Sequence, residues 1–412
     1  MDNISHTLVG LAAGELIHRS LPEEPSIESQ GVRRRLLLIS CFLASNFPDL
    51  DLILTPLLPA PLGYLLHHRG HTHTFLYEIP QAILLFALIW LLSKPARVLL
   101  KASKTARLGL ASAIGVGFVF HILLDSFNSY GIHPFHPIDS NWYYGDSIFI
   151  IEPVFWLSFG FPLAMMMRRK WAKWFALSFL TVMPLLFAYK KYLHPVALVL
   201  LLLMGGVLAL WQARVGVRTR RVLFTAFAIS ILFIGIQKFS SNTAKDVVRV
   251  GAELNDPEFQ MMEVAATPAP TNPLCWGFIA IEKHKTLDVY KLTRGRLSLA
   301  PGLLPVGSCA EVVSEAPDEQ KEIAPGLVFL TEERGDLALL RKLVAENCHV
   351  SAWMRFARAP LVTETEANDL RFTMRGSRAN FTLMNIPSMA AHTCSDAIPQ
   401  WNRPREDLLQ TN

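Results

Sequence analysis

Residues 67–92 read HHRGHTHTFLYEIPQAILLFALIWLL, and this stretch joins a histidine cluster to a long apolar segment. The apolar part, Thr74–Leu92, is long enough to cross a bilayer as a helix, since a full span takes about 20 residues. Four histidines fall within the seven residues that open the stretch. The stretch therefore predicts a membrane helix that begins beside a group of imidazoles.

Further apolar runs extend this pattern over residues 1–238. Hydrophobic residues make up 51% of the 412 residues and charged residues only 18%, a balance that excludes an ordinary soluble protein of this size. Two short runs, Ile4–Ile17 and Leu36–Phe47, are expected to form half-buried or re-entrant helices against the bundle. The other runs could cross the membrane with some tilt: Leu108–Leu124, Pro153–Met167, Trp174–Tyr189, Pro195–Trp211 and Val222–Ile236.

The charges between the apolar runs predict the topology. Lys94–Arg107 carries five basic and no acidic residues, and Arg168–Lys173 and Gln212–Arg221 carry four basic residues each. The positive-inside rule places these segments in the cytoplasm. Asp125–Glu152, with four acidic residues and no Lys or Arg, is expected on the outer side. The sequence thus predicts a multi-pass protein of a bacterial inner membrane, embedded in the lipid bilayer, and the charge pattern does not favour nucleic-acid binding.

The composition of the sequence changes from apolar to more polar after residue 238. Residues 239–273 are polar and end in Pro-Ala-Pro-Thr-Asn-Pro, which predicts a linker. Residues 274–398 are predicted to form a small β-rich (α+β) periplasmic domain, and residues 399–412 a disordered tail. Four of the five cysteines lie in this part, which permits disulfides without fixing the pairs. The expected strands are alternating stretches between turn residues: Trp276–Glu282, Leu287–Leu292, Val350–Arg358 and Leu370–Thr373.

The predicted fold is therefore a mainly α, membrane-embedded helical bundle followed by a small β-rich extracytoplasmic domain. Within the bundle, His121 and Asp125 lie four residues apart at the end of an apolar run, so they share one helix face. Ionisable groups at such depth are costly and line a cavity or pair with something. A divalent cation would satisfy both side chains. The alternative is a His–Asp hydrogen bond that only joins two helices.

Other histidines and aspartates are expected at the same membrane edge. His71 and His73 alternate with Thr72 and Thr74, whose hydroxyls could orient ligating imidazoles. For His67 and His68 taken singly, a surface position is favoured over a ligand role. Asp49 and Asp51 follow a proline that ends a helix, so one could ligate while the other orients, or both could simply form a polar turn. The predicted topology also brings His6 to the outer side.

Such a site would activate water and polarise a phosphoryl or carbonyl oxygen. Zinc is the expected metal, with manganese or magnesium as alternatives. Arg69 could pair with an anionic substrate group or could equally be an interfacial arginine at the level of the lipid headgroups.

Five spaced segments, MDNISHTLVGLAAGE, FPDLD, HRGHTHT, HILLDSFNSYG and WYYGDSIFIIEP, resemble the YdjM-like family of inner-membrane metal-dependent hydrolases. The resemblance runs in order over about residues 1–160. It implies metal-site positions at His6, Asp49, His71, His121 and Asp125, and it leaves His71 and His73 as alternatives. It also places four further residues near the site: Asp51, His67, His73 and Asp146. With Arg69, we assign Asp51, His67 and Asp146 to catalytic support.

The order of these ligands is also similar to that of helical zinc-dependent phospholipases C, although no second His-x-x-x-Glu pair is evident. The predicted function is an integral-membrane metal-dependent hydrolase that acts at the outer membrane face, on a lipid or another phosphoester substrate. The alternative, from a different class, is a non-catalytic membrane scaffold or metal-binding sensor.

Overall fold

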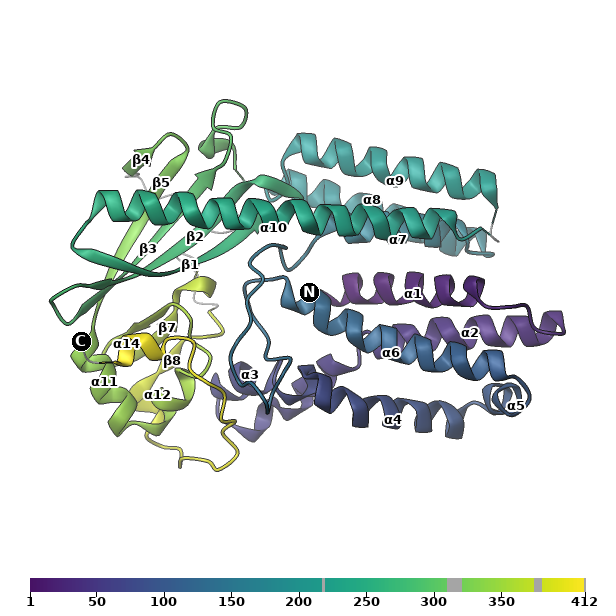
Figure 1. The fold of residues 1–412 in the computed structure, drawn as a ribbon, viewed down its shortest axis with the longest axis horizontal. Coiled ribbons are helices and arrows are strands. Elements are labelled where there is room, and N and C mark those ends of the chain that lie inside the picture. The colour runs from purple at the N-terminus through teal and green to yellow at the C-terminus, as the bar shows by residue number, and fades with distance from the viewer. Residues whose placement is uncertain (217–218, 310–320, 374–379, 411–412) are drawn as a thin grey trace. The chain divides into compact units, whose positions relative to one another are not determined.

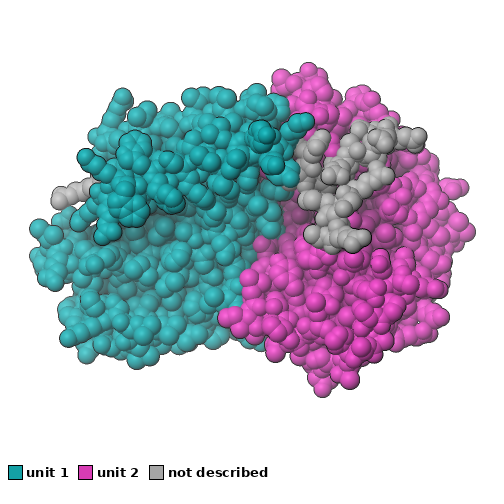
Figure 2. All heavy atoms as spheres, turned by 180° about the vertical axis from the view of Figure 1, so that it is seen from behind, with its two compact units in different colours: residues 1–50, 72–128, 149–235 teal, residues 51–71, 129–148, 236–412 magenta. Residues whose placement is uncertain are grey.

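The computed structural model describes residues 1–216, 219–309, 321–373 and 380–410, and the chain forms two compact units (Figure 2). Unit 1 comprises Met1–Leu50, Thr72–Asn128 and Phe149–Gly235, and unit 2 comprises Asp51–His71, Ser129–Ile148 and Ile236–Asn412. Residues 1–238, which we had predicted to form one domain, are divided between the two units. Two loop segments from the first half of the chain carry buried Leu62, Leu65 and Trp142, which belong to the core of unit 2.

Unit 1 is helical (Figure 1). Within the described residues, six helices of the chain are long and apolar enough to cross a membrane. Only 11% of the apolar window of α8 and 22% of that of α9 are buried, so most of their apolar side chains are left for lipid. The helices of this unit are α1 (Asn3–Ser20), α2 (Ile27–Ala44), α4 (Phe75–Leu92), α5 (Lys94–Ala102), α6 (Lys104–Ser126), α7 (Pro153–Met165), α8 (Lys170–Tyr189), α9 (Pro195–Val215) and the start of α10 (Arg221–Asn255).

Helices α1, α2 and α6 run beside one another and form the densest part of unit 1 (Figure 1). Leu37 and Cys41 of α2 and Leu110 and Ala113 of α6 are buried in one cluster. The cluster also contains Ala13 of α1. Because these side chains are small or medium in size, the three helices approach closely, as membrane helices do.

The bounds of two helices differ from those of the predicted apolar runs. Leu36–Phe47 is half-buried, as predicted, but it is part of a longer helix, because α2 begins at Ile27, where Ser26 caps it in a capping box. The run Ile27–Leu57 is long enough to span a membrane. Conversely, α7 has 13 residues, fewer than a full span takes. The basic residues Arg33–Arg35 concealed the true start of α2, since they break the apolar run.

Unit 2 contains two antiparallel sheets in the described residues, which confirms the β-rich prediction for the C-terminal part. The larger sheet has the strand order β1-β2-β3-β5-β4, and the smaller has the order β6-β7-β8. The strands of the two sheets are β1 (Phe259–Ala269), β2 (Asn272–His284), β3 (Val289–Ser298), β4 (Lys321–Ala324), β5 (Leu327–Asp336), β6 (Pro360–Val362), β7 (Glu366–Asp369) and β8 (Met384–Asn385).

The predicted linker, residues 239–273, is not a linker. Its first part continues α10 to Asn255 and its last part forms β1. Ala244, Val248 and Ala252 lie four residues apart on α10 and pack against sheet residues such as Phe278. The segment reads as polar because only this one helix face is apolar. The Pro-rich stretch is the turn of the β1–β2 hairpin, where Ala269 pairs with Asn272.

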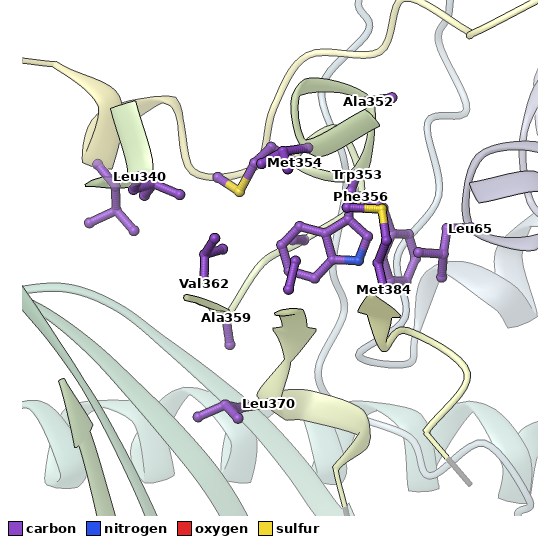
Figure 3. Packing of buried hydrophobic residues seen from close by; sticks show 14 of the residues in the cluster. Leu65, Leu340, Ala352, Trp353, Met354, Phe356, Ala359, Val362, Leu370 and Met384 are labelled. Carbon is purple, nitrogen blue, oxygen red and sulfur yellow. The ribbon is translucent and has the colours of Figure 1, made fainter. Parts of the chain in front are cut away.

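A second core lies around Trp353, which is fully buried (Figure 3). Trp353 Nε1 donates a hydrogen bond to the Thr382 carbonyl at 2.8 Å. Two predicted strands are wrong here: Val350–Arg358 begins within the helix α12 (Cys348–Trp353), and Leu370–Thr373 forms a 3-10 turn (Leu370–Phe372). In both cases a side chain just upstream, Asn347 or Asp369, caps the turn and starts it.

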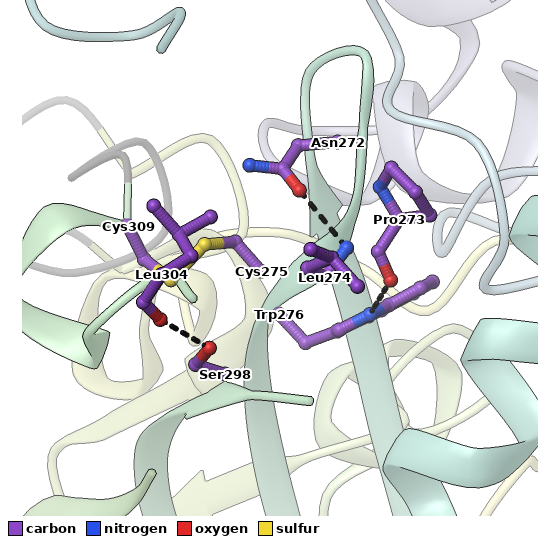
Figure 4. Close-up of a disulfide and its surroundings, with 8 residues drawn as sticks. All are labelled: Asn272, Pro273, Leu274, Cys275, Trp276, Ser298, Leu304 and Cys309. Carbon is purple, nitrogen blue, oxygen red and sulfur yellow. Dashed lines mark hydrogen bonds between the residues drawn. A yellow bond between two sulfur atoms is a disulfide. The ribbon is translucent and has the colours of Figure 1, made fainter. Parts of the chain in front are cut away.

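Unit 2 also contains two disulfides and a C-terminal tail that packs into its core. The bonds found among the described residues are Cys275–Cys309, drawn in Figure 4, and Cys348–Cys394. The tail is ordered as far as residue 410, contrary to prediction, and residues 411–412 lie outside the described residues. Trp401 is fully buried and donates to the Leu66 carbonyl at 3.2 Å. The short helices of this unit are α3 (Leu62–His67), α11 (Leu337–Glu346), α12, α13 (Ile386–Met389) and α14 (Glu406–Leu409).

Candidate metal centre

Four side chains of unit 1 converge on one point although they come from three separate segments. Asp49 follows α2 in the 3-10 segment Pro48–Leu57. His73 ends the 3-10 turn His71–His73, directly before Thr74 caps α4. His121 and Asp125 lie on the last turns of α6. Of these four residues, His73, His121 and Asp125 are fully buried.

The distances within this group fit a bound cation. His73 Nε2 lies 3.0 Å from His121 Nε2, 3.4 Å from Asp49 Oδ1 and 3.4 Å from Asp125 Oδ2. One ligand atom from each of the four residues lies within 4.8 Å of all the others. Tetrahedral zinc with bonds of 2.0–2.1 Å keeps its ligand atoms about 3.4 Å apart. The four ligand atoms are therefore close enough to one another to share a single cation.

Neighbouring groups hold the two imidazoles in the orientation that ligation needs. His121 Nδ1 donates to the Ser45 carbonyl at 2.8 Å, which leaves the lone pair of Nε2 facing the other donors. His73 Nδ1 lies 3.0 Å from the Thr72 hydroxyl. Ligating histidines are characteristically fixed through their second nitrogen in this way. Thr72 thus lies where the sequence predicted a hydroxyl partner, whereas the Thr74 hydroxyl caps α4 instead.

His6 forms the edge of the group. Its ring stacks on that of His121 with centroids 4.1 Å apart, and its Nε2 lies 3.3 Å from Asp125 Oδ1. The amine of Met1 also contacts Asp125 Oδ1. Because Oδ1 is engaged in this way, Oδ2 of Asp125 is the oxygen that faces His73 and His121.

The position of His6 depends on how α1 is anchored. Asp2 caps the helix by accepting from the backbone of Ile4 and Ser5. The same carboxylate accepts from Trp156 Nε1 of α7 at 3.1 Å. These contacts fix the first turn of α1, and with it the side chain of His6. Sequence analysis missed Asp2, Ser45 and Trp156, since their partners are remote in the chain.

Glycines allow α1, α2 and α6 to meet closely beside the donors. A Cβ added at Gly10 would lie 2.2 Å from Ser45 Oγ, and one at Gly14 would lie 2.8 Å from the Leu37 carbonyl. A Cβ at Gly117, one turn before His121, would lie 2.5 Å from Ala44 Cβ. These three positions therefore admit only glycine without a shift of the helices.

Asp51, His67 and Arg69, predicted as catalytic, belong to unit 2 rather than to the donor group. Asp51 accepts hydrogen bonds from His68 Nδ1 at 3.0 Å and from the backbone of Arg69 at 2.8 Å. The Arg69 guanidinium lies 4.8 Å from the centre of the Tyr130 ring. His67 is buried, and this burial lowers its pKa. These contacts of Asp51 and Arg69 shape the turn around residues 67–70, and they do not support a catalytic role.

The structure selects His73 over His71. His71 belongs to unit 2, where its ring lies 4.6 Å from that of Trp401 and 5.4 Å from that of His136. Burial, followed by the neighbouring charges of His136 and His67, lowers its pKa. The prediction of His71 as a ligand is therefore not supported. Residues 71 and 73 follow one another in a tight turn, so their side chains diverge.

Asp146 is part of a buried ion-pair network in unit 2. It accepts from Arg358 at 2.8 and 2.7 Å and from Lys245 Nζ at 2.6 Å. Burial alone would raise its pKa, but the charges of Arg358 and Lys245 outweigh burial and lower the pKa to about 2. Arg358 also pairs with Glu263. These contacts give Asp146 a structural role in this network, and its predicted catalytic role stays a prediction.

The described residues contain a second group of side chains of the kinds that bind metals, Cys348, His349 and Cys394. The two cysteines are joined in a disulfide. They therefore offer no thiolates for a metal. The donor group of unit 1 remains the candidate centre.

Comparison with known proteins finds a family match for the N-terminal part of the chain. The family model described as YdjM inner membrane protein matches residues 1–195, which contain all four donors and His6. A similar curated relative is "Uncharacterized protein YfhP" of Bacillus subtilis (strain 168), 25% identical over 158 residues. That match covers 38% of this chain and 44% of the relative, so the chain spans less than half of the relative's length. No solved structure matches the chain. Residues 1–195, slightly less than half of the chain, thus resemble the YdjM inner membrane protein family.

Proposed function

We propose that this chain is a metal-dependent hydrolase of the inner membrane that cleaves a phosphoester or a lipid-linked substrate. The observation that carries the proposal is the convergence of Asp49, His73, His121 and Asp125 with the spacing of metal ligands. A divalent cation held there would supply an activated water near neutral pH and would polarise a phosphoryl or carbonyl oxygen.

Zinc is the metal that this donor set favours. Two imidazole nitrogens and two carboxylate oxygens suit zinc, whereas magnesium and manganese prefer more oxygen ligands. The orientation of His121 by the Ser45 carbonyl supports ligation through Nε2. His6 acts as a positioning residue, since it holds Asp125 Oδ1 and so directs Oδ2 toward the other donors.

The outer membrane face is the proposed location of the reaction. Two independent observations support this side. The positive-inside rule assigns Lys94–Arg107, at the start of α6, to the cytoplasm, so the donor end of α6 faces outward. The disulfides of unit 2 would form and persist in an oxidising compartment such as the periplasm.

The test uses the purified full chain with His121→Ala and Asp125→Ala combined. Hydrolysis is measured on a panel of chromogenic phosphodiesters, phosphomonoesters and phospholipids, together with the thermal unfolding of each protein. We expect the double variant to lose both its metal and its activity while it remains folded. His392→Ala, which removes an exposed histidine outside the donor group, is the matched control and should leave both unchanged.

Two outcomes would count against the proposal. Activity retained in a folded double variant rejects the donor group as the active site. A wild-type protein that holds metal firmly yet cleaves no substrate of the panel favours the scaffold or sensor alternative instead.

A further inference from the structure

An apolar groove of about 490 Å³ lies between α2 and α4 in unit 1. This volume is in the range of small-molecule sites, which is about 300–1,000 Å³. The groove ends at the beginning of α5, where Ser93 and Pro95 line it. Apolar side chains of the two helices form its walls: Leu36, Ile39 and Leu43 of α2, and Leu85, Leu88 and Leu92 of α4.

The groove opens toward the lipid. Both helices that form it are long and apolar enough to span the membrane. Ile39 is 54% exposed and Leu92 is 81% exposed, so side chains on both walls are not covered by protein. In a bilayer, hydrocarbon chains are the molecules that fill a hollow of this kind.

One end of the groove carries a positive charge with no partner. Arg35 lines this end and is exposed. Its neighbours are paired, Arg33 with Glu24 at 2.9 Å and Arg34 with Glu15 at 2.8 Å. No ion pair or hydrogen bond of Arg35 is found in the described part of the chain. Arg35 is therefore available to an anion outside the protein.

The surroundings of Arg35 favour an anionic headgroup. The first turn of α5 adds the partial positive charge of a helix N-terminus at the same end of the groove. Lys94–Arg107 follows with five basic residues, and the positive-inside rule places it at the cytoplasmic leaflet, where anionic lipids reside. Basic pockets between membrane helices on that side are typical sites for lipid headgroups.

We propose that this groove binds one anionic phospholipid of the inner leaflet, with an acyl chain between α2 and α4 and the phosphate on Arg35. Ten residues of α2 separate Arg35 from Ser45, the residue that orients His121. This separation corresponds to about 15 Å along the helix. The lipid site is thus distinct from the donor group and does not depend on the proposed hydrolase activity.

The test is native mass spectrometry of the detergent-solubilised full chain, titrated with dioleoyl phosphatidylglycerol or with dioleoyl phosphatidylcholine. We expect one tight phosphatidylglycerol adduct per chain. Arg35→Gln should weaken this adduct about tenfold or more, because it removes a charge-assisted contact to the phosphate. Ile39→Trp should also weaken it, since the larger ring fills the groove that Ile39 lines.

Two matched controls separate this site from general effects. Arg168→Gln removes an exposed positive charge from another basic segment of the same membrane side, and Ile83→Trp enlarges an exposed residue of α4 outside the groove. Both should bind phosphatidylglycerol like the wild type. Equal binding of the two lipids by the wild type, an unchanged adduct in Arg35→Gln or Ile39→Trp, or an equal loss in the controls would overturn the proposal.

Discussion

At the scale of single residues, the donor group is a set of nitrogen and oxygen ligand atoms that face one another. With Nδ1 of His121 donating to Ser45, its Nε2 carries a lone pair that points at His73 Nε2, 3.0 Å away. Two carboxylates lie beside them in a buried position. Burying carboxylates is costly unless they are paired. The Met1 amine pairs with Asp125 Oδ1, and a cation at the centre would add a counter-charge that all four groups share.

Substitution of His73 and of His71 distinguishes these two neighbouring histidines. We expect His73→Ala to lose the bound metal, because it removes one of the four donors. His71→Ala should retain the metal, since His71 contacts Trp401 and His136 in unit 2. The metal content of the two purified proteins is the measurement. The reverse result would return the ligand role to His71.

Asp146→Asn tests the structural role of the ion-pair network. The change removes one of the two carboxylates that pair with the buried Arg358 guanidinium and leaves Glu263, so we expect a loss of about 3 kcal/mol in stability. Metal content should not change in the protein that remains folded. Thermal unfolding and elemental analysis are the measurements. Full stability combined with loss of activity would instead support the catalytic role predicted from sequence.

The same carboxylate predicts a dependence of stability on pH. The pKa of Asp146 is about 2 in the folded chain and close to 3.9 in an unfolded one. Its contribution to stability is therefore complete above about pH 4 and is lost as the pH falls toward 2. Unfolding of the wild type and of Asp146→Asn between pH 2 and 6 should show a difference that shrinks with acidity. A constant difference would contradict this account.

How much of the site was predictable depends on the distance between partners in the chain. The spacing of His121 and Asp125 on an apolar helix was sufficient to identify them, because one helix face holds both. His71 and His73 could not be separated, because the local sequence does not reveal how the turn directs each side chain. The role of Asp146 was missed because its partner Arg358 lies 212 residues away.

At the scale of elements, close helix packing positions the donors. Gly117 on α6 lies against Ala44, the last residue of α2, and Ser45, which follows it, holds His121. A side chain at Gly117 would therefore push α2 and α6 apart at the metal centre. The sequence pattern identified these helices as apolar, but the contact of their backbones was not visible in it.

Gly117→Val and Gly115→Val form a matched pair on α6. We expect Gly117→Val to cost about 1–3 kcal/mol and to weaken metal binding, since a Cβ there would lie 2.5 Å from Ala44 Cβ. Gly115→Val should have little effect, because no atom lies within 4 Å of a Cβ added there. Thermal stability and metal affinity are compared for both variants. Equal effects would show that the close approach of α2 is unimportant.

The composition of α10 and of the β1–β2 turn explains why residues 239–273 were mistaken for a linker. The C-terminal part of α10 exposes polar residues on most sides and keeps only Ala244, Val248 and Ala252 for the sheet. Small alanines give a weak apolar signal. A proline-rich hairpin turn and a linker have the same composition, so only strand pairing distinguishes them.

At the scale of the whole molecule, the fold class followed from composition and from the length of the apolar runs. The division into units did not, because segments 51–71 and 129–148 belong to unit 2 although they lie between membrane helices in the sequence. Their few buried aromatic and leucine residues, such as Leu65 and Trp142, carry no periodic pattern. Their assignment depends on contacts with residues beyond 236.

The disulfides test the compartment of unit 2. If this unit lies in the periplasm, Cys275–Cys309 and Cys348–Cys394 should be oxidised in cells, while Cys41 remains a buried thiol. Alkylation of denatured protein without prior reduction, followed by mass spectrometry, should label Cys41 alone. Removal of one disulfide by a Cys→Ser pair should cost about 2–4 kcal/mol. Labelling of all five cysteines would place unit 2 in a reducing compartment.

The account depends most directly on the presence of a cation between Asp49, His73, His121 and Asp125. The measurement is elemental analysis of the purified full chain and of His121→Ala, combined with X-ray absorption at the edge of the metal found. We predict zinc bound to the wild type, with nitrogen and oxygen ligands at about 2.0–2.2 Å, and loss of this metal in the variant. A wild-type protein that binds no divalent metal, or a variant that retains it with unchanged ligands, would contradict the central claim.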